Sequence, residues 1–400
     1  MSASVSAGPR RRLVFICESG TDVRLVTGLK QRFELTLLLR PAFGPRTINW
    51  KDEGPEPVRI IEGPAGRVAF AAFVGAWLVR HRAELDAVLA QNAGVAALAA
   101  NACRGLTRVP TFMLICSPNI AYFHCRYERG ELGLPAYLAG RTLLEAARAG
   151  NALLGHRYLV LSDYLGGQVS YGWREKVRVV PLYGVDTSRF RPVPPEEKRR
   201  LRVKLGLPEE GFLIFFSSRV APEKDTESLL DACALLKASG RSFWMLNLSG
   251  GHQRLKQLAL ERGLGDRTLT RDAVDPVHEL PAYYQASDVC AQVSLEEGLG
   301  FSPLEALACE VPVVATDVGG LRETIRDGET GLSVPVRAPR ALADALARVM
   351  DEPERFLALA RQGRRMVRER FEASRCFDGF ATLVEEELSS RSSASRARRT

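Results

Sequence analysis

The chain has 400 residues, of which 46% are apolar and 26% charged, a composition typical of a soluble globular protein and a length that suits two domains. No apolar run reaches the ~18–20 residues of a membrane span, since the longest, Val68–Val79, has twelve and is followed by Arg80. The net charge of +8 lies mostly at the two ends of the sequence, with three positive charges in residues 1–12 and four in residues 391–400. The rest of the chain therefore carries a net charge of about +1, which does not support a basic surface for binding nucleic acid.

Both ends are rich in Ser, Ala and Arg, which predicts disordered basic tails at residues 1–12 and 391–400. The apolar run Leu13–Cys17 that follows the first tail is too short for the core of a secretory signal. Eight cysteines are scattered without a C-x-x-C pair or zinc-ligand spacing. Together these features predict a cytoplasmic protein with reduced thiols.

Through the rest of the chain, apolar β-rich runs alternate with helical patterns, an order that predicts parallel sheets with helices on both faces. In the first half the predicted strands are Leu13–Cys17, Phe33–Leu39, Thr111–Cys116, Tyr158–Leu161 and Val177–Pro181. The predicted helices there are Thr21–Gln31, Val68–Gln91 and Ala136–Leu154. We interpret the run Val68–Val79 as part of a buried helix, with a membrane-surface helix as the alternative.

A proline-rich, charged stretch at Pro192–Lys204 interrupts this pattern and predicts a domain boundary. Beyond it, the predicted strands are Phe212–Phe216, Phe243–Leu248, Asp288–Val293 and Val311–Ala315. The predicted helices are Thr226–Ala238, Gln253–Arg262, Pro303–Cys309, Leu321–Arg326 and Arg340–Met350, with helical pattern continuing from Glu354 to Leu388. We therefore expect an α/β protein with two doubly wound, Rossmann-like domains that face each other across a cleft. The first domain comprises residues 13–190 and the second residues 191–375. A C-terminal helix, residues 376–390, is expected to cross back to the first domain.

The segment Glu297–Glu305, E-G-L-G-F-S-P-L-E, places two carboxylates eight residues apart around a glycine-rich turn that opens a helix. With Ser302 as the N-cap, Glu305 would complete a capping box, which is a purely structural explanation. That explanation does not account for Gly298 and Gly300, because glycines ahead of a helix let backbone N–H groups approach an anion closely. Acids beside a phosphate repel it unless one of them faces hydroxyl groups. We therefore predict a site for a sugar joined to a diphosphate.

Three further motifs lie at or near the ends of predicted strands. Ser217–Lys224 offers Arg219 and Lys224, both suited to phosphate oxygens. Pro181–Asp186 ends the first domain, and Asp317–Glu323 is a candidate second wall of the pocket. Sequence motifs for a nucleoside triphosphate loop, a nicotinamide fingerprint, a nucleophile elbow and a zinc protease are absent. A D-x-D pair is also absent, so neither a metal nor a cofactor is expected.

In this order the motifs resemble the retaining glycosyltransferases of family 4, which have the GT-B fold. The run Glu297–Glu323 resembles the family signature, and S-S-R-V-A-P-E-K resembles its Arg/Lys diphosphate clamp. P-L-Y-G-V-D resembles the interdomain P-x-G-V-D, and H-E-L-P-A-Y-Y-Q-A-S-D-V resembles the segment before the donor loop. The match covers about Tyr158–Val336, whereas the first 150 residues match only in architecture.

The resemblance implies roles for individual residues. Glu297, Arg219 and Lys224 would form the catalytic group, with the carboxylate at the hydroxyls of the donor sugar and the two cations at the leaving diphosphate. Glu305 would bind the hydroxyls of the nucleotide ribose. The other implied donor-binding residues are Gly298, Gly300, Phe301, Ser302, Gly250, Gly251, Arg271 and Val274.

The predicted acceptor side departs from the family pattern. A Gly-Gly turn is common after the first strand of the family, whereas this chain has Ser19 and Gly20 there. A histidine often follows the strand that here ends at Cys116, whereas this chain has Asn119 close to that strand and His124 only later. Ser19, Gly20, Asn119 and His124 are therefore candidate acceptor-side residues, and the acceptor itself is left open.

We expect a retaining glycosyltransferase that moves a sugar from a nucleotide-diphosphate sugar, UDP- or GDP-linked, to a hydroxyl of a glycan, a lipid or a small molecule, without a required metal. A nucleotide-sugar 2-epimerase on the same fold and a non-catalytic nucleotide-sugar-binding protein are the alternatives. The expected partners are the nucleotide sugar and the acceptor, with no nucleic acid. Peripheral contact with an anionic membrane, at the inner face of the cell membrane, is a further hypothesis. The sequence leaves the oligomeric state open.

Overall fold

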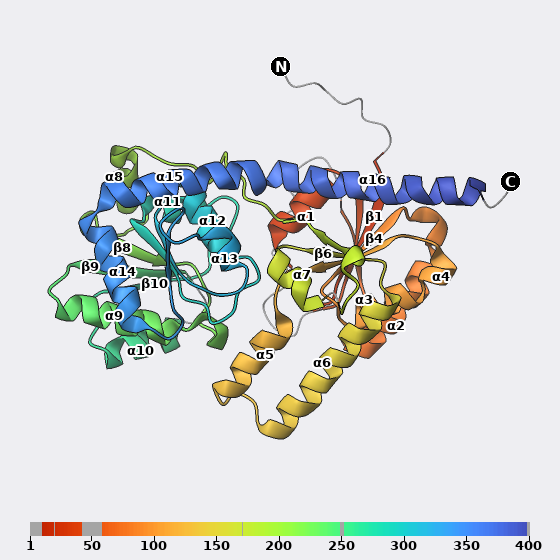
Figure 1. The fold of residues 1–400 in the computed structure, drawn as a ribbon, viewed down its shortest axis with the longest axis horizontal. Coiled ribbons are helices and arrows are strands. Elements are labelled where there is room, and N and C mark those ends of the chain that lie inside the picture. The colour runs from red at the N-terminus through yellow and green to blue at the C-terminus, as the bar shows by residue number, and fades with distance from the viewer. Residues whose placement is uncertain (1–9, 20, 42–57, 170, 249–251, 398–400) are drawn as a thin grey trace, which may run out of the picture. The chain divides into compact units, whose positions relative to one another are not determined.

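The computed structural model describes residues 10–19, 21–41, 58–169, 171–248 and 252–397, which pack as two units, each on its own parallel sheet (Figure 1). Unit 1 comprises residues 1–117, 138–183 and 374–400, and unit 2 comprises residues 118–137 and 184–373. The outer parts of the two predicted tails, residues 1–9 and 398–400, lie outside the described residues.

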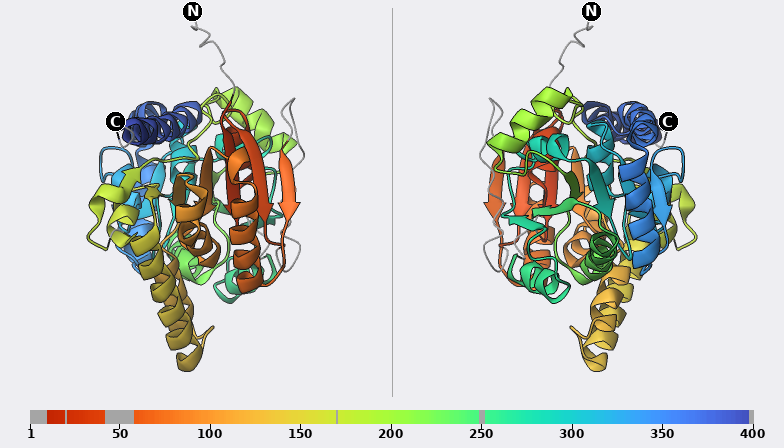
Figure 2. Two further views of the ribbon diagram at one scale, coloured as in Figure 1. Left: turned by 90° about the vertical axis from the view of Figure 1, so that its right-hand side faces the viewer. Right: turned by 90° about the vertical axis from the view of Figure 1, so that its left-hand side faces the viewer.

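Unit 1 holds a seven-stranded sheet in the order β3-β2-β1-β4-β5-β6-β7. Its strands are β1 (Arg12–Cys17), β2 (Glu34–Leu39), β3 (Arg59–Glu62), β4 (Ala87–Gln91), β5 (Thr111–Ile115), β6 (Arg157–Val160) and β7 (Val177–Val179). Its helices are α1 (Val23–Lys30), α2 (Arg67–Arg80), η1 (Arg82–Glu84), α3 (Val95–Ala102), α4 (Arg104–Thr107), most of α6 (Leu134–Leu154), α7 (Asp163–Val169), η2 (Arg174–Lys176) and nearly all of α16 (Ala373–Ala397). The left view of Figure 2 shows the strands side by side, with β3 at one edge of the sheet.

The central strands of unit 1 are short apolar runs. Every residue of β4 and β5 is buried, as expected for parallel strands that helices cover on both faces. The register aligns Leu13 of β1 with Leu35 of β2 on one side and with Ala87 of β4 on the other. The chain order therefore reverses between β1 and β4, where loops from the carboxyl ends of two neighbouring strands diverge.

Helix α16 packs on unit 1 with aromatic side chains. The fully buried ring of Phe380 lies 5.5 Å from the rings of Phe33 and Phe112, measured between centroids. The ring of Phe377 occupies the space that a side chain at Gly28 of α1 would need. The last helix of the chain is thus part of the hydrophobic core that contains the first strand.

Unit 2 holds a six-stranded sheet in the order β10-β9-β8-β11-β12-β13. Its strands are β8 (Phe212–Phe216), β9 (Phe243–Leu248), β10 (Thr268–Arg271), β11 (Val289–Gln292), β12 (Val313–Thr316) and β13 (Leu332–Val334). Its helices are α5 (Asn119–Glu128), α8 (Pro195–Lys204), η3 (Pro222–Lys224), α9 (Thr226–Ala238), α10 (His252–Glu261), α11 (Leu280–Ala286), α12 (Phe301–Ala308), α13 (Leu321–Thr324), α14 (Pro339–Asp351) and α15 (Pro353–Arg370).

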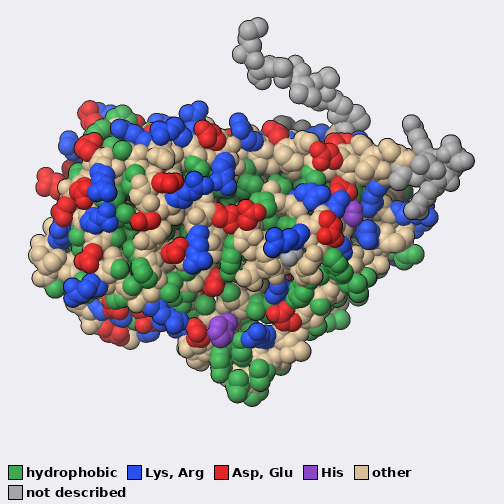
Figure 3. Space-filling view, viewed as in Figure 1, with side chains coloured by type: hydrophobic (Ala, Val, Ile, Leu, Met, Phe, Trp, Pro, Cys, Tyr) green, Lys and Arg blue, Asp and Glu red, His purple; other side chains and the backbone are tan. Residues whose placement is uncertain are grey.

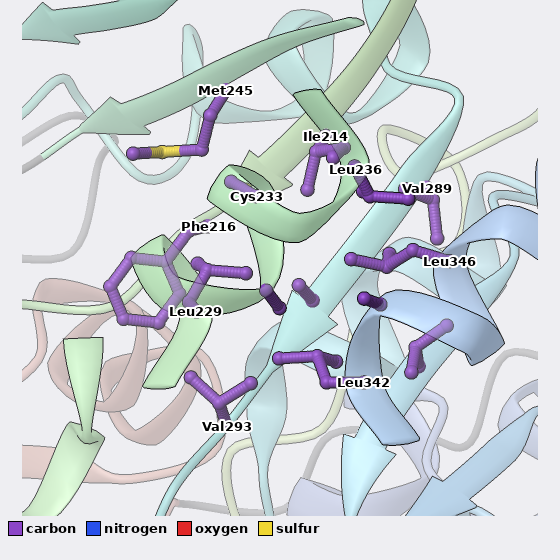
Figure 4. Packing of buried hydrophobic residues seen from close by; sticks show 14 of the residues in the cluster. Ile214, Phe216, Leu229, Cys233, Leu236, Met245, Val289, Val293, Leu342 and Leu346 are labelled. Carbon is purple, nitrogen blue, oxygen red and sulfur yellow. The ribbon is translucent and has the colours of Figure 1, made fainter. Parts of the chain in front are cut away.

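Helices cover both faces of this second sheet. On one face, Ile214 of β8 packs in a buried cluster with Leu229 of α9 and Leu346 of α14 (Figure 4). The next residue of β8, Phe215, points to the other face, where its ring centroid lies 4.9 Å from that of Tyr284 in α11. This alternation is the two-residue period of a strand, and it explains why the buried run Phe212–Phe216 is apolar throughout.

Most of the expected elements correspond to observed ones, but one predicted helix is wrong in its second half. The predicted helix Val68–Gln91 ends at Arg80 as α2, and Ala87–Gln91 forms β4 in the middle of the sheet. A continuous apolar run carries no periodicity that separates a buried helix from a buried strand. The interpretation of Val68–Val79 as a buried helix is confirmed, since its large side chains other than Val68 are largely buried.

Three strands had no counterpart among the expected elements. β3 and β10 are edge strands whose residues are half-buried or exposed, and β13 has only three residues. Such strands lack the apolar run or the clean alternation on which a prediction from sequence depends. Helix α5 was also not anticipated, and it contributes to the site described below.

The described surface shows no large segregation of charge on the face seen in Figure 3, where acidic and basic side chains are interspersed. Among the helices of the described residues, none is both long and apolar enough to span a lipid bilayer. All eight cysteines lie in the described part of the chain, and each carries a free thiol.

Candidate functional site

The strand order of unit 2 brings together two loops that are far apart in the sequence. Because β8 and β11 are neighbours in the parallel sheet, the loops after their carboxyl ends, Ser217–Asp225 and Val293–Gly300, lie side by side. The backbone N–H of Leu295 donates to the carbonyl of Glu223 at 2.8 Å, which joins the loops directly. This is the point where the chain order in the sheet reverses, the usual position of a ligand site in such folds.

Lys224 and Glu297 meet at this point. The Lys224 Nζ lies 2.5 Å from Oε2 of Glu297, and the two side chains are 12% and 13% exposed. The same oxygen accepts hydrogen bonds at 3.1 Å from Gln292 Nε2 and from Ser294 Oγ. The other oxygen, Oε1, accepts from the backbone N–H of Gly298 at 3.3 Å.

These neighbours determine the ionisation of Glu297. Burial raises the pKa of a carboxyl, but here the Lys224 charge, the hydrogen bonds from Lys224 and Ser294 and the N–H of Gly298 outweigh burial. The pKa of Glu297 is therefore held below its ordinary value, and the carboxylate stays ionised at neutral pH. With Lys224 beside it, the pair adds almost no net charge to the loop.

A third loop, after β12, closes against the same residue. The N–H of Gly320 donates to the carbonyl of Glu297 at 3.0 Å, and Thr316 Oγ1 donates to the carbonyl of Ser294 at 2.6 Å. A Cβ at position 320 would lie 2.0 Å from the carbonyl oxygen of Gly298. The segment Asp317–Glu323, expected as a second wall, is thus in backbone contact with the glycine-rich loop.

Helix α12 starts differently from the capping box that the sequence suggested. The helix begins at Phe301, its N-cap is Gly300 with a φ of +86°, and no side chain caps it. The capping-box interpretation of Ser302 and Glu305 is therefore wrong. Gly300, in a left-handed conformation, takes the position of the polar cap. A Cβ at this position would lie 2.4 Å from the side chain of Leu321. The first N–H groups of an α-helix have no acceptor within the helix itself, so the start of α12 is a position that suits an anion.

Glu305 lies on α12 and is 2% exposed. Burial, and after it the negative charge of Glu305, raise the pKa of the Tyr284 hydroxyl well above its ordinary value.

The other candidate donor-side residues are more dispersed. Arg219 is exposed and pairs with Glu223 at 3.2 Å rather than with Glu297. Arg271 ends β10 and donates to the carbonyl of Gly206 at 3.1 Å, and Val274 is half-buried in the loop that follows. Gly250 and Gly251 lie outside the described residues.

The candidate acceptor-side residues do not form one cluster within a unit. Ser19 follows β1 in unit 1, and its carbonyl accepts from the Cys17 thiol at 2.7 Å, while Gly20 lies outside the described residues. Asn119 begins α5 in unit 2. His124, on the same helix, lies 3.0 Å from the Tyr137 hydroxyl and 3.5 Å from Glu128, so its ring contacts neighbours within the α5–α6 segment.

Sequence reasoning missed three residues around Glu297. Gln292 and Ser294 end β11 and begin the loop, a position at which polar side chains can be suspected from the strand pattern alone. Tyr122 of α5, whose hydroxyl lies 3.4 Å from Oε1 of Glu297, is 175 positions away in the sequence and carried no local signal. Within the described part of the chain, no group of three or more His, Cys, Asp or Glu side chains is arranged to hold a metal ion.

Residues 197–366 match the sequence profile of the family described as "Glycosyl transferases group 1". The D-inositol 3-phosphate glycosyltransferase of Acidothermus cellulolyticus is 34% identical over 203 residues, which are 46% of this chain and 45% of that protein. The 2-deoxystreptamine glucosyltransferase of Streptomyces kanamyceticus is 36% identical over 198 residues, 49% of this chain and 50% of that protein. The chain spans about half the length of the curated relatives that it matches.

The fold extends the similarity to the whole chain. The crystal structure of Anabaena HepE in complex with UDP and glucose matches with a TM-score of 0.75 at 18% identity, covering 94% of this chain and all of HepE. At this identity the match shows the fold alone, which is GT-B with two parallel α/β sheets. The profile of the glycosyl transferases group 1 family thus matches residues 197–366, and the similarity in fold covers 94% of the chain.

Proposed function

We propose that this protein is a retaining glycosyltransferase that uses a nucleotide-diphosphate sugar as donor and a hydroxyl group as acceptor. In this reaction the bond between the anomeric carbon and the diphosphate oxygen breaks, and a bond from that carbon to the acceptor oxygen forms. The acceptor proton passes to an oxygen of the leaving diphosphate, so no separate base is required. The observation that carries the proposal is the Lys224–Glu297 pair where β8 and β11 diverge, beside the start of α12.

Each charged group near that point has a role that suits its chemistry. Lys224 supplies a cation for the departing diphosphate, and Arg219, which is exposed and paired with Glu223, supplies bidentate donors. The N–H groups at the start of α12, from Phe301 and Ser302, favour an anion by about 0.3–1 kcal/mol at an exposed site. Since Glu297 is paired with Lys224, it can accept hydrogen bonds from sugar hydroxyls without repelling the diphosphate.

The remaining donor-side roles come from the family resemblance. Glu305 binds the ribose hydroxyls, and the loop near Arg271 and Val274 borders the base. The similar structures include HepE with UDP, with UDP and glucose and with UDP-glucose, which supports a nucleotide sugar as the substrate class. The family relatives transfer sugars to different acceptors according to their names, so they do not select one for this chain.

A thermal-shift screen tests the proposal. The purified protein is heated with UDP, GDP, ADP, dTDP and their common sugars, with and without EDTA. A ligand at 100 times its Kd stabilises the folded state by about 2.7 kcal/mol, so one nucleotide should raise the melting temperature clearly, and EDTA should not abolish the effect. Glu305→Gln should remove the shift, whereas Glu310→Gln, beyond the end of the same helix and paired with Arg361, should keep it.

The possible results separate the alternatives. A shift followed by transfer to an acceptor, with retention at the anomeric carbon, supports the proposal. Interconversion of the nucleotide sugar at C2 would indicate an epimerase. Binding without turnover over a broad acceptor panel would indicate a non-catalytic binding protein, and no shift with any nucleotide would contradict all three.

We also propose that the protein acts in the cytoplasm. Contact with an anionic membrane would depend on the arginine-rich ends of the sequence, because the apolar run of α2 is used for packing inside unit 1. Co-sedimentation with anionic vesicles that disappears at high salt, and that is lost when residues 391–400 are removed, would support such contact.

A further inference from the structure

Helix α5 brings one side chain to both charges of the candidate site. The Tyr122 hydroxyl lies 3.4 Å from Oε1 of Glu297, and the centroid of its ring lies 5.8 Å from Nζ of Lys224. Helix α5 packs against η3, the turn that ends at Lys224. A residue from the first half of the sequence is therefore part of the polar environment of a loop in the second half.

The two oxygens of Glu297 are not equivalent. Oε2 accepts three hydrogen bonds, from Lys224, Gln292 and Ser294, at 2.5–3.1 Å. Among the contacts of the described residues, Oε1 accepts from the N–H of Gly298 at 3.3 Å and from the Tyr122 hydroxyl at 3.4 Å, both long for hydrogen bonds. Oε1 is thus the oxygen with capacity for a shorter hydrogen bond from a substrate hydroxyl, and Tyr122 stands beside it.

Ion pairs hold α5 in this position. Arg129, immediately after the helix, lies 2.6 Å from Asp225 and 3.1 Å from Glu227. Glu128, the last residue of the helix, lies 2.7 Å from Arg337. Asp225 directly follows Lys224, has a φ of +42° and is almost completely buried. The same contacts therefore fix the helix and the backbone next to the catalytic lysine.

The phenol is a neutral donor under physiological conditions. Burial, and after it the negative charges of Glu297 and Glu223, raise the pKa of Tyr122 well above its ordinary value of 10. A neutral hydroxyl can donate to Oε1 and at the same time accept from a sugar hydroxyl, which a phenylalanine cannot do. The geometry and the chemistry both suit a group that aligns the carboxylate with a substrate.

We propose that Tyr122 is a positioning residue of the proposed transfer, whose hydroxyl orients Oε1 of Glu297 toward the sugar of the donor. This inference rests on the proposed function. It assigns to α5, and not only to the glycine-rich loop, a part in recognising the sugar portion of the nucleotide sugar. The inference predicts different effects on the two portions of the ligand. Tyr122 affects binding of the sugar, whereas binding of the nucleoside diphosphate is unchanged without it.

The test compares Tyr122→Phe with Tyr127→Phe. Both substitutions remove a phenol hydroxyl from α5, but Tyr127 stacks on Tyr137 with ring centroids 4.4 Å apart and contacts neither Glu297 nor Lys224. The probes are UDP-, GDP-, ADP- and dTDP-glucose and the corresponding nucleoside diphosphates, and the pair that binds best is used. Binding is measured by calorimetry, and turnover by release of the nucleoside diphosphate.

We expect Tyr122→Phe to lower kcat/KM for the nucleotide sugar about three- to tenfold, the loss for one weak hydrogen bond to a charged group. The Kd of the nucleoside diphosphate should change less than about twofold. Tyr127→Phe should behave as the unsubstituted protein. In a protein that already carries Glu297→Gln, Tyr122→Phe should cost little more, since a residue that acts through Glu297 gives non-additive effects.

Two results would overturn the inference, and they are distinguishable. If the unsubstituted protein turns over the nucleotide sugar and Tyr122→Phe matches Tyr127→Phe, Tyr122 has no positioning role, while the proposed function stands. If the unsubstituted protein binds none of the nucleotide sugars, the proposed function fails, and the inference fails with it.

Discussion

Among the described residues, five hydrogen-bond donors surround the two carboxylate oxygens of Glu297, and one of these donors is the ammonium group of Lys224. An isolated buried carboxylate costs several kcal/mol in desolvation and would repel a diphosphate. Pairing with Lys224 removes both difficulties, because the lysine neutralises the charge and both carboxylate oxygens accept hydrogen bonds. A carboxylate paired in this way can accept a hydrogen bond from a sugar hydroxyl without repelling a neighbouring phosphate.

The depressed pKa of Glu297 predicts a pH dependence of stability. A carboxyl whose folded pKa lies below its unfolded value of about 4.5 stabilises the protein fully above that value, and the contribution disappears as the pH falls through the folded pKa. Glu297→Gln should therefore lower the free energy of unfolding at pH 7 by about 3 kcal/mol, because it leaves Lys224 buried without a charged partner. The difference should shrink as the pH falls below about 5.

Chemical denaturation at several pH values between 7 and 3 measures this effect. Glu210→Gln removes an exposed carboxylate from the same unit and should change stability by less than about 0.5 kcal/mol at every pH. A difference between Glu297→Gln and the unsubstituted protein that stays constant down to pH 3 would contradict the assigned ionisation.

At the scale of elements, the site is assembled by three loops from the carboxyl ends of β8, β11 and β12. Backbone hydrogen bonds connect them: Leu295 to Glu223 joins the first two loops, and Gly320 to Glu297 joins the last two. Two glycines, Gly300 and Gly320, allow the second and third loops to approach each other. The glycines of this region therefore have a packing reason in addition to any role in binding an anion.

Gly320→Ala tests this arrangement. The φ of −70° at Gly320 suits alanine, so the expected cost is steric: the new Cβ would lie 2.0 Å from the carbonyl oxygen of Gly298, and backbone cannot move aside cheaply. We expect a loss of about 1–3 kcal/mol in stability and a loss of nucleotide binding, as the loop carrying Glu297 shifts. Thermal unfolding and calorimetric titration measure the two effects.

Gly379→Ala is the matched control for that substitution. It lies inside α16, where a Cβ meets no atom within 4 Å, so it should leave binding unchanged and stabilise slightly through helix propensity. Normal nucleotide binding by Gly320→Ala would mean that the contact between the two loops is not required by the site.

The elements that the sequence predicted well are those with a strong local signal. The strand Phe212–Phe216 and the helix Thr226–Ala238 were predicted with the bounds that the structure has. The strand Ala87–Gln91 was missed because its short apolar run also fits a helical pattern, and only its pairing with β1 and β5 identifies it. Local pattern cannot supply such pairings.

In the candidate site, too, local sequence patterns identified some residues and missed those that depend on tertiary packing. Glu297 and Lys224 were recognised from short motifs, and the sheet order then explains why they meet. The start of α12 was assigned to Ser302 because a polar cap is the common choice, whereas Gly300 takes that position through a left-handed conformation that the sequence does not reveal. Tyr122 could not be found, since its contact with Glu297 depends on how a distant helix packs.

At the scale of the molecule, the two units do not follow the order of the sequence. Residues 118–137 pack with the second half of the chain, and residues 374–400 pack with the first. In both cases side chains explain the placement: ion pairs from Arg129 and Glu128 attach α5 to unit 2, and aromatic contacts attach α16 to unit 1. Each unit is built on its own sheet, so we expect that a buried substitution in unit 1 can lower stability without changing ligand binding by unit 2.

Phe380→Ala tests this independence, because the ring of Phe380 is fully buried in unit 1 between Phe33 and Phe112. Removing it leaves a cavity and should lower the stability of unit 1 by about 3–5 kcal/mol. The Kd for a nucleoside diphosphate, measured below the unfolding temperature, should change less than about twofold, since the described donor-side residues lie in unit 2. Glu386→Ala, an exposed change on the same helix, should alter neither quantity. If Phe380→Ala weakened nucleotide binding as strongly as Glu305→Gln, the donor site would have to depend on unit 1, and the assignment of that site to the loops of β8, β11 and β12 alone would be wrong.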